Sequence, residues 1–471
     1  MSEEAKLHRG ISLPMAIFVV VGVVIGSSIW LLPTSALADA GPGMFLGYLL
    51  AVIPGIFMAL LCAYLGATVP TAGGSYVVIS RTLGPLLGAI MLALIIPGAG
   101  GALAFMAGTF GIFLNAALGL AIPVLVSGAL ILLAAYVVNI LRVEVSATVG
   151  MLITIFGDIL VIALFIIFGL PHVKAANLTP LFPKGFGAVV MASLLFFFSY
   201  AGFTAVLDIG GEIKNPKKNI PLALLFGMII LIALYTTQAF VVAGTTPWTV
   251  AAQEIQSRGT FTVTDIAAQF VPQGILSIMP ALILIAIAST IYPMLLAYSR
   301  DFMAAGRDRL LPASVGRINK RYGTPVAGLT LLLIFSLVLF ALILVLAPAL
   351  ELPLQTAVDL FAGISVSGLL AFEILLSIAA LRIAGKFPEM EAASGFRLAR
   401  PVLWIVAIGG MVSAVAFLGL LGMDEPLILE SLAILVIPFV VYYFIRNAFV
   451  RRRNISLKAN TATWPSDVTA E

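Results

Sequence analysis

The stretch Gly-Val-Val-Ile-Gly-Ser-Ser-Ile-Trp, residues 22–30, decides how the fold is interpreted, because it interrupts an apolar segment near the N-terminus. A second stretch, Phe-Ser-Tyr-Ala-Gly-Phe at residues 198–203, interrupts the sixth apolar segment. A helix broken inside a membrane leaves backbone N–H and C=O groups unpaired, which hydrocarbon does not tolerate unless they line a protein-walled cavity. Two such breaks in matching positions predict a binding site near the middle of the bilayer.

The composition places the chain in a lipid bilayer. Hydrophobic residues make up 62% of it and charged residues only 10%, whereas about 25% of the residues of a soluble domain are charged. Apolar stretches of about 20 residues, long enough to cross the hydrocarbon core, recur along the chain. We predict an all-α integral membrane protein with twelve transmembrane helices, at residues 12–38, 43–68, 85–114, 122–141, 146–170, 186–211, 221–244, 273–303, 325–347, 356–383, 401–422 and 427–448.

The distribution of Lys and Arg predicts the orientation, because cytoplasmic loops collect basic residues. With the N-terminus inside, the outer segments hold only Lys174, Lys184 and Arg258, and the other 22 of the 25 basic residues are inside. We therefore expect both termini in the cytoplasm and the protein in the plasma or inner membrane. The net charge of +4 is explained by this asymmetry and by contact with anionic membrane lipid, so no nucleic acid partner is expected.

Several functional classes find no support in the residues present. The single cysteine, Cys62, allows no disulfide framework and no paired-cysteine metal site. The two histidines, His8 and His172, are far apart and have no spaced partner for a metal or a catalytic dyad. We expect no enzyme, no metal and no cofactor. No small-residue cleavage site follows the first apolar stretch, so we expect it to be a retained membrane span.

Five motifs in chain order give the sequence a family resemblance. They lie at residues 22–33, 70–76 (Pro-Thr-Ala-Gly-Gly-Ser-Tyr), 198–203, 211–221 (Gly-Glu-Ile-Lys-Asn-Pro-Lys-Lys-Asn-Ile-Pro) and 299–312 (Ser-Arg-Asp-Phe-Met-Ala-Ala-Gly-Arg-Asp-Arg-Leu-Leu-Pro). Together they resemble the amino acid-polyamine-organocation transporter superfamily, and within it the amino acid permeases.

The resemblance implies a leucine-transporter-type fold, whose core is ten helices in two inverted five-helix repeats. The repeats would span residues 12–170 and 186–383, with helices 1 and 6 broken. Two additional helices, at residues 401–448, would follow this core. The cytoplasmic N-terminus comprises residues 1–11, and the polar cytoplasmic tail, residues 451–471, is expected to be disordered past Arg453.

The residues at the two breaks predict a site for a small zwitterion, an amino acid. The N–H groups of residues 26–29 open the second half of the first helix, a positive helix end that suits a carboxylate. The carbonyls around residues 198–201 end the first half of the sixth helix and suit an ammonium group. The predicted substrate-binding residues are Val23, Gly26, Ser27, Ser28, Ile29, Phe198, Ser199, Ala201, Gly202 and Thr204.

Two features favour a neutral, apolar amino acid as the substrate. By the resemblance, Thr204 stands where arginine and polyamine exchangers tend to carry an acidic residue, and residues 97–101 (Pro-Gly-Ala-Gly-Gly) leave room for a bulky side chain. The alternative for that stretch is a helix-packing groove with a kink at Pro97. Ser28 replaces a motif glycine and adds bulk beside the expected carboxylate. The alternative functions are a cationic amine or polyamine exchanger that uses Asp208, one helical turn from Thr204, and a substrate-sensing receptor.

The fifth span holds the residues from which a coupling ion is predicted. Many prokaryotic relatives carry a lysine in the fifth span, where this chain has Gly157, so that fixed cation is missing. Asp158 follows it, and a carboxyl group deep in a span is a functional candidate because its burial is costly. It could carry H⁺, or bind Na⁺ with the carbonyls and hydroxyls of a second set of residues: Gly22, Ile25, Ser289 and Thr290. A structural hydrogen bond and an exchanger that needs no ion are the alternatives.

Two gates are expected. By the resemblance, Phe198 would cover the bound substrate from outside. Tyr76, Glu212 and Arg300 would close the inner side, and the alternative for Glu212 and Arg300 is that they are solvated loop charges. Transport would then proceed by alternating access, as a bundle of spans 1, 2, 6 and 7 rocks against spans 3, 4, 8 and 9. Symport and antiport both fit this scheme, as do a monomer and a homodimer.

Overall fold

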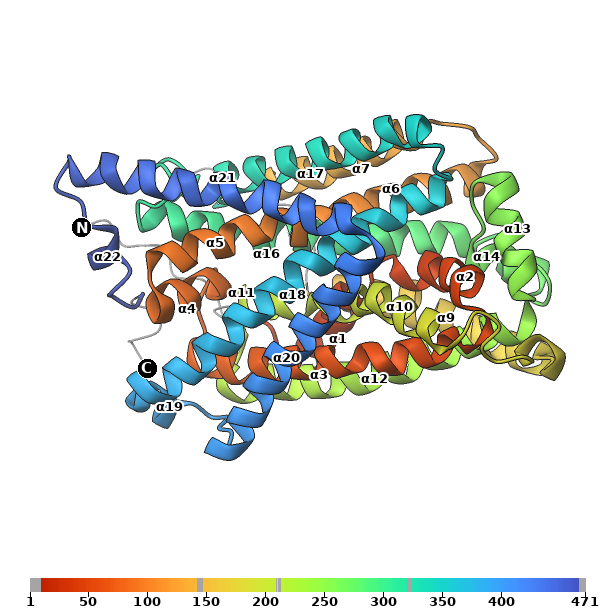
Figure 1. The fold of residues 1–471 in the computed structure, drawn as a ribbon, viewed down its shortest axis with the longest axis horizontal. Coiled ribbons are helices and arrows are strands. Elements are labelled where there is room, and N and C mark those ends of the chain that lie inside the picture. The colour runs from red at the N-terminus through yellow and green to blue at the C-terminus, as the bar shows by residue number, and fades with distance from the viewer. Residues whose placement is uncertain (1–9, 142–146, 209, 211–212, 320–322, 466–471) are drawn as a thin grey trace.

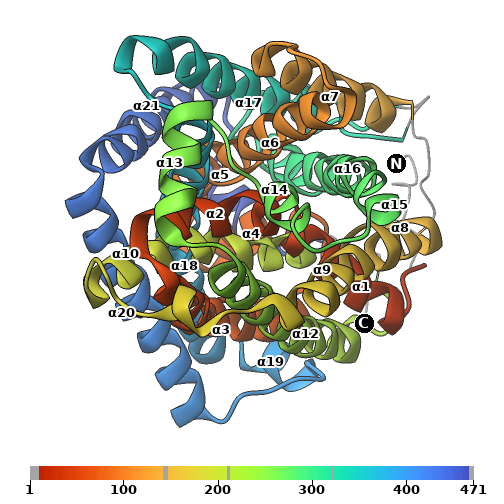
Figure 2. The same ribbon diagram turned by 90° about the vertical axis from the view of Figure 1, so that its right-hand side faces the viewer.

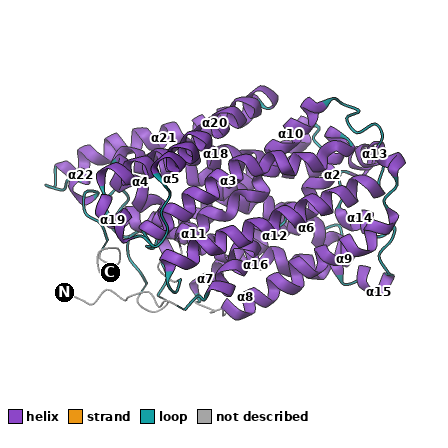
Figure 3. Cartoon of the chain, turned by 90° about the horizontal axis from the view of Figure 1, so that it is seen from below, coloured by secondary structure: helices purple, strands orange, loops and turns teal. Residues whose placement is uncertain are grey.

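The helical composition of the chain is seen directly in its computed structural model, which describes residues 10–141, 147–208, 210, 213–319 and 323–465. Regular secondary structure in these residues is helical throughout (Figure 3), apart from one isolated bridge between Ile11 and Ile213. Ten helices in this part of the chain are long and apolar enough to cross a membrane. The prediction of an all-helical membrane protein is therefore confirmed.

The ten candidate spans follow the predicted order along the chain. They are Leu13–Ala40, Pro42–Thr68, Pro85–Leu118, Met151–His172, Pro216–Thr245, Gln273–Arg307, Val326–Leu350, Leu354–Lys386, Arg400–Met423 and Pro426–Arg451. Two shorter apolar helices, Val124–Ile140 and Phe186–Tyr200, occupy the fourth and sixth places of that order. Each of the twelve predicted apolar segments thus forms a helix, and two of these helices are shorter than a usual span.

The helices near the site are named as in Figure 1. They are α1 (Leu13–Ile25), α2 (Ser28–Ala40), α3 (Phe45–Thr68), α4 (Gly74–Leu83), α5 (Pro85–Ile95), η2 (Ile96–Gly100), α6 (Gly101–Leu118), α7 (Val124–Ile140), α8 (Ala147–Ile153), η3 (Thr154–Ile159), α9 (Leu160–Gly169), α10 (Phe186–Phe197), η6 (Phe198–Phe203), α11 (Thr204–Asp208), α12 (Pro216–Thr245) and α16 (Met279–Arg307). The others are α13 (Trp248–Arg258), α14 (Val263–Ala267), α15 (Gln273–Leu276), α17 (Val326–Leu346), α18 (Leu354–Lys386), α19 (Pro388–Ala393), α20 (Arg400–Asp424), α21 (Pro426–Arg451) and α22 (Leu457–Asn460).

The short helices between spans gather at opposite ends of the molecule. In Figures 1 and 3, α4, α19 and α22 lie at one end, and α13 and α14 lie at the other. The first group comes from segments predicted to be inside, and the second from a segment predicted to be outside. The alternation of sides inferred from the charges therefore agrees with the arrangement of the helices.

The most buried spans lie in the centre of the bundle. In the most apolar 18-residue stretch of each span, 83% of the stretch is buried in Pro85–Leu118 but only 6% in Pro426–Arg451. Viewed nearly end-on, α20 and α21 run along the rim, while α2 lies inside (Figure 2). A helix that is apolar on all sides must be covered by protein or by lipid, so the rim helices present their side chains to the bilayer.

Part of the polar tail differs from the predicted disorder. Residues 454–465 are packed against the molecule: Leu457 is 1% exposed, and Asn460 Nδ2 donates to the carbonyl of Asp308 over 2.9 Å. The Trp464 ring meets the ring of Phe387 edge-on, with centroids 5.2 Å apart. Because the tail is polar on the whole, its few apolar residues were not recognised in the sequence. Their burial stabilises the packed position of the segment.

Candidate functional site

The first helix is interrupted at the predicted position. Helix α1 ends at Ile25 and α2 begins at Ser28, and Gly26 between them has φ 48° and ψ −128°. Residues with a Cβ rarely adopt a positive φ. A Cβ on Gly26 would also lie 2.7 Å from Cε of Met106 on α6. The backbone conformation therefore favours glycine here, and a Cβ would also displace the end of the Met106 side chain.

The sixth helix is not broken in the way the sequence suggested. Helix α10 continues into η6, a 3₁₀ stretch over Phe198–Phe203, and then into α11. A 3₁₀ helix keeps its backbone groups in i→i+3 hydrogen bonds. The carbonyls that were expected to be free therefore lie in a tightened helical turn. Gly202 permits the close approach of η6 to α1, because a Cβ there would lie 3.1 Å from the carbonyl oxygen of Val23.

Two side chains of α12 bind carbonyls around the break in the first helix. Tyr235 Oη donates to the carbonyl of Val24 over 3.1 Å, and Gln238 Nε2 donates to the carbonyl of Ile29 over 3.0 Å. These residues were missed in the sequence, where Tyr and Gln within an apolar span were the available signal. They supply the partners that hydrocarbon cannot offer.

A cavity lies beside this break and is here named the outer cavity. The volume that the centre of a water molecule can occupy in this cavity is about 20 Å³. This is enough for about one water molecule. None of the described residues that line it is charged. They are Val23, Val24, Ile25, Gly98, Ala102, Met106, Phe198, Gly202, Met294, Tyr298 and Leu369.

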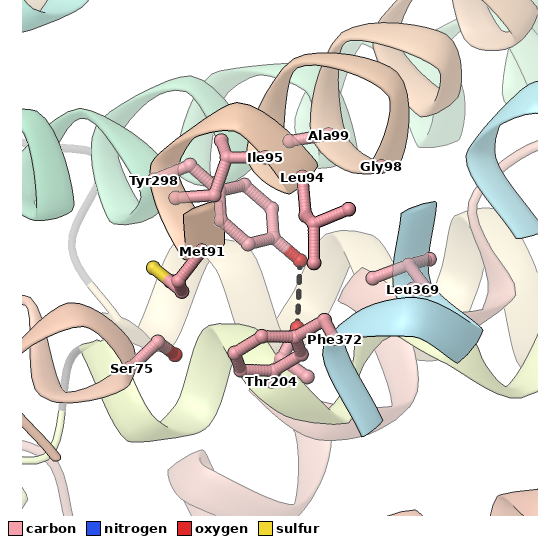
Figure 4. Close-up of a pocket in the computed structure, with 10 residues that line it drawn as sticks. All are labelled: Ser75, Met91, Leu94, Ile95, Gly98, Ala99, Thr204, Tyr298, Leu369 and Phe372. Carbon is pink, nitrogen blue, oxygen red and sulfur yellow. Dashed lines mark hydrogen bonds between the residues drawn. The ribbon is translucent and has the colours of Figure 1, made fainter. Parts of the chain in front are cut away.

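A second cavity, here named the inner cavity, has Ser75 of α4 in its lining (Figure 4). It is of similar size, and Gly98, Tyr298 and Leu369 line both cavities. Thr204 Oγ1 and Tyr298 Oη share a hydrogen bond of 2.9 Å. Both hydroxyls are buried, so this bond forms a polar bridge between the two spaces. Ser75, Met91, Leu94, Ile95, Ala99 and Phe372 complete the lining of the inner cavity.

The predicted substrate residues divide into two groups. Val23, Phe198 and Gly202 line the outer cavity and Thr204 lines the inner one, while Gly26 contacts the Met106 side chain beside the outer cavity. The side chains of the second group do not line either cavity: Ser28 Oγ donates to the carbonyl of Ile25 over 3.2 Å, and the hydroxyls of Ser27 and Ser199 are buried. Ile29 takes part through its carbonyl. For Ala201 only the backbone, within η6, is described.

Most of the remaining lining residues come from three other spans, and sequence reasoning missed most of these. Residues 97–101 were predicted to leave room, and Gly98 does line both cavities within η2, a π-helical turn that contains Pro97. Met106, Met294 and Leu369 carried no sequence signal, because each is an ordinary apolar residue in an apolar helix. Tyr298 directly precedes the Ser-Arg-Asp motif at residues 299–301, and this position was the available clue.

Three of the predicted ion-coupling residues, Gly22, Asp158 and Thr290, lie on segments that neighbour one another. Thr290 Oγ1 donates to the carbonyl of Gly22 over 3.1 Å, and a Cβ on Gly22 would overlap Oγ1 of Thr154 in η3. Asp158, also in η3, is fully buried, and its carboxyl oxygens have no hydrogen-bond partner among the described residues. Each of the other two predicted residues takes part in a local bond: the carbonyl of Ile25 accepts from Ser28, and Ser289 Oγ donates to the carbonyl of Ala286.

The predicted gate residues lie at both sides of the cavities. The ring of Phe198 meets that of Phe105 on α6 at a centroid distance of 4.9 Å, beside the outer cavity. Tyr76 is fully buried in the first turn of α4, where burial raises the pKa of its phenol well above the ordinary value. Arg300 is 7% exposed on α16, and Glu212 lies outside the described residues.

An ion pair that was not predicted joins Arg81 and Asp308. Arg81 on α4 makes two contacts with the carboxylate of Asp308, one of them 2.9 Å long between Nη2 and Oδ1. The Arg81 side chain also donates to the carbonyl of Thr463 in the tail over 3.1 Å. The pair fixes α4 against the loop that follows α16.

The comparisons with known proteins agree with this geometry. A family model described as "Amino acid permease" matches residues 11–444, and the chain therefore belongs to the amino acid permease family. It is similar to the branched-chain amino acid permease BcaP of Bacillus subtilis (strain 168), with 26% identity over 393 residues that cover 79% of this chain and 80% of the relative. It is also similar to BcaP of Lactococcus lactis subsp. cremoris (strain MG1363), with 28% identity over 347 residues, 68% and 73% of the two chains.

A third relative is named after a different substrate. The "Methylthioribose transporter" of Bacillus subtilis (strain 168) is 27% identical over 426 residues, which cover 87% of this chain and 88% of that protein. The family and these relatives are transporters rather than enzymes. With its ten apolar helices, the chain is a multi-pass membrane protein of the amino acid permease family.

Proposed function

We propose that this protein carries a neutral amino acid with an apolar side chain across the cell membrane by alternating access. The observation that supports this most directly is the outer cavity, which adjoins the break in the first helix and has no charged residue in its described lining. The N-terminal end of α2 suits the substrate carboxylate, and an apolar lining suits an apolar side chain. The name of BcaP, a branched-chain amino acid permease, supports the same class.

The architecture proposed for this cycle has twelve spans, with both termini in the cytoplasm. Ten candidate spans and two shorter apolar helices in the predicted order support it. Spans 1, 2, 6 and 7 would rock against spans 3, 4, 8 and 9, exposing the cavities to one side at a time. Each cavity holds about one water here, so the structure is a closed conformation and substrate entry requires these spans to move.

Two methionines suit the outer cavity to side chains of more than one shape. Met106 and Met294 lie in its lining, and methionine has an unbranched, rotatable side chain that adapts to its surroundings. We infer a site that accepts several apolar amino acids and discriminates among them by size, chiefly against the rigid face formed by Gly98 and Leu369.

The amine or polyamine exchanger is disfavoured by the position of Asp208. This carboxyl group is absent from the described lining of both cavities. Its Oδ1 accepts a hydrogen bond from the N–H of Ser75 over 2.9 Å, so it is engaged with α4 rather than facing a ligand. Without a carboxylate in the cavity, a second positive charge on the substrate would remain uncompensated.

The proposal is tested by counterflow in proteoliposomes that hold the purified protein. Vesicles loaded with L-leucine, L-isoleucine or L-valine are expected to take up radiolabelled L-leucine, and vesicles loaded with L-arginine or putrescine are not. Counterflow of labelled arginine or putrescine in vesicles loaded with the same compound, without any L-leucine counterflow, would refute the neutral substrate. Counterflow of labelled methylthioribose in vesicles loaded with methylthioribose, without any L-leucine counterflow, would refute the zwitterion site, since that molecule has no carboxylate or ammonium group.

A further inference from the structure

Two buried carboxyl groups meet at the inner end of the site, and neither lines a cavity. Asp208 ends α11 in the sixth span, and Asp301 lies on α16 in the eighth. Both side chains are fully buried. In the proposed cycle these two spans belong to opposite moving parts, so the carboxyl groups are together only while the inner side is closed.

Both carboxyl groups bind the first turn of the same short helix, α4. Asp208 Oδ1 accepts from the N–H of Ser75 and Asp301 Oδ1 accepts from the N–H of Tyr76, each over 2.9 Å. The first N–H groups of a helix have no partner within it, and its positive end stabilises a negative charge. Helix α4 has ten residues, long enough for such an end to be well formed.

The glycine pair of the motif at residues 70–76 allows this contact. A Cβ on Gly73 would lie 2.7 Å from the carbonyl oxygen of Arg300, and a Cβ on Gly74 would lie 2.5 Å from that of Leu207. The start of α4 is therefore held directly between α11 and α16. Any larger residue would push α4 away from the two carboxyl groups.

The second oxygen of each carboxyl group indicates a bound proton. Oδ2 of Asp208 and Oδ2 of Asp301 are buried and have no donor among the described residues. The two carboxyl groups are neighbours, because they accept from the adjacent N–H groups of Ser75 and Tyr76, and each influences the other electrostatically. Two ionised carboxylates in contact repel each other, and burial makes this state costly. One proton shared between them makes an O–H···O bond that satisfies both oxygens.

The groups around the pair fit one proton and one negative charge. Arg300 acts on Asp208 as the nearby positive charge and compensates one carboxylate. Among the described residues, the other titratable neighbours that interact with the pair are Tyr298 on α16 and Cys62 on α3, which are neutral near pH 7 even at their ordinary pKa values. They add no further charge to the cluster.

A polar route connects the pair with the outer cavity. The hydroxyls of Thr204 and Tyr298 bridge the two cavities, and the inner cavity has room for about one water. Ser75 lines that inner cavity and donates its N–H to Asp208. Its own hydroxyl is buried beside the Asp208 carboxyl group, so it extends the chain of hydroxyls to the carboxyl pair.

We propose that Asp208 and Asp301 form a proton site, loaded from the outer cavity while the inner gate is closed and emptied into the cytoplasm when the gate opens. Opening separates α11 from α4 and α16, breaks the O–H···O bond and brings water to both carboxyl groups. The proton then passes from Oδ2 to water, leaving two carboxylates, and no other bond changes. This inference rests on the proposed alternating access and identifies H⁺ as the coupling ion.

The experiment uses proteoliposomes that contain the full chain and a trapped pH-sensitive dye. External L-leucine is expected to acidify the lumen as it enters. Asp208→Asn and Asp301→Asn should each reduce this leucine-driven acidification at least tenfold, while L-leucine counterflow stays measurable. Glu389→Gln is the matched control, because it makes the same change at an exposed carboxylate of α19, and it should acidify like the wild type.

The outcomes separate this inference from the proposed function. Counterflow without acidification in the wild type, or acidification that persists in both Asn variants, overturns the proton site and leaves the transporter. Loss of acidification in Asp158→Asn alone would also overturn it and assign the proton to η3. Absence of L-leucine counterflow in the wild type refutes the proposed function itself. If the Asn variants do not fold, Thr204→Val provides the test: it breaks the hydroxyl route, and it must slow acidification more than counterflow.

Discussion

Replacing Gly98 by Ala should change which amino acids are transported without weakening the fold. Gly98 lines both cavities, and a Cβ there would meet Leu369 at 3.5–3.8 Å, which is ordinary contact. The added methyl group therefore causes no overlap in the closed protein. It takes up the room that a large substrate side chain would need.

The expected size of the effect follows from that methyl group. One methylene too many in an apolar pocket costs about 1–3 kcal/mol, or roughly a 5- to 150-fold loss of affinity for L-leucine. Binding of L-alanine, which leaves the space unfilled, should change little. Replacing glycine by alanine inside a helix stabilises it by about 0.5–1 kcal/mol, so the unfolding temperature should stay the same or rise.

The assay is half-saturation of counterflow for L-leucine and for L-alanine, together with the unfolding temperature. Gly419→Ala is the matched control: Gly419 lies in α20, and a Cβ there would meet nothing within 4 Å. It should show the same gain in stability and no change in selectivity. Equal losses for both substrates in Gly98→Ala would refute the reasoning, and would show that residues 97–101 serve helix packing instead of substrate size.

Three further predictions concern the break and the ion. Gly26→Ala should lower stability by about 1–3 kcal/mol because residue 26 has a φ of 48°, and a denaturation curve that matches the wild type would contradict this. Tyr235→Phe leaves the carbonyl of Val24 without its donor and should cost about 1–3 kcal/mol, seen as a lower unfolding temperature; an unchanged temperature would argue for another partner. Replacing Na⁺ by choline should leave L-leucine uptake unchanged in the wild type and in Asp158→Asn, whereas loss of uptake in the wild type alone would assign a sodium site to Asp158.

The sequence by itself determined the class of fold and the position of the break. Membrane spans are set by the local density of apolar residues over a fixed length, and the break is set by a glycine whose backbone conformation other residues rarely adopt. Both are properties of a short window of sequence. The helical order, the interruption at Gly26, and the cavity positions of Val23, Phe198, Gly202 and Thr204 could be predicted for that reason.

Only the tertiary structure decided which residues from distant spans meet. The helices of this chain are apolar on nearly every side, so the sequence pattern does not show which face turns inward. The meetings of Gly98 with Leu369 and of Thr204 with Tyr298 depend on how each helix is rotated and tilted against its neighbours. The carboxyl pair of Asp208 and Asp301 depends in addition on α4 reaching between two spans. Contacts of this kind are set by packing across the whole bundle, which no local stretch of sequence encodes.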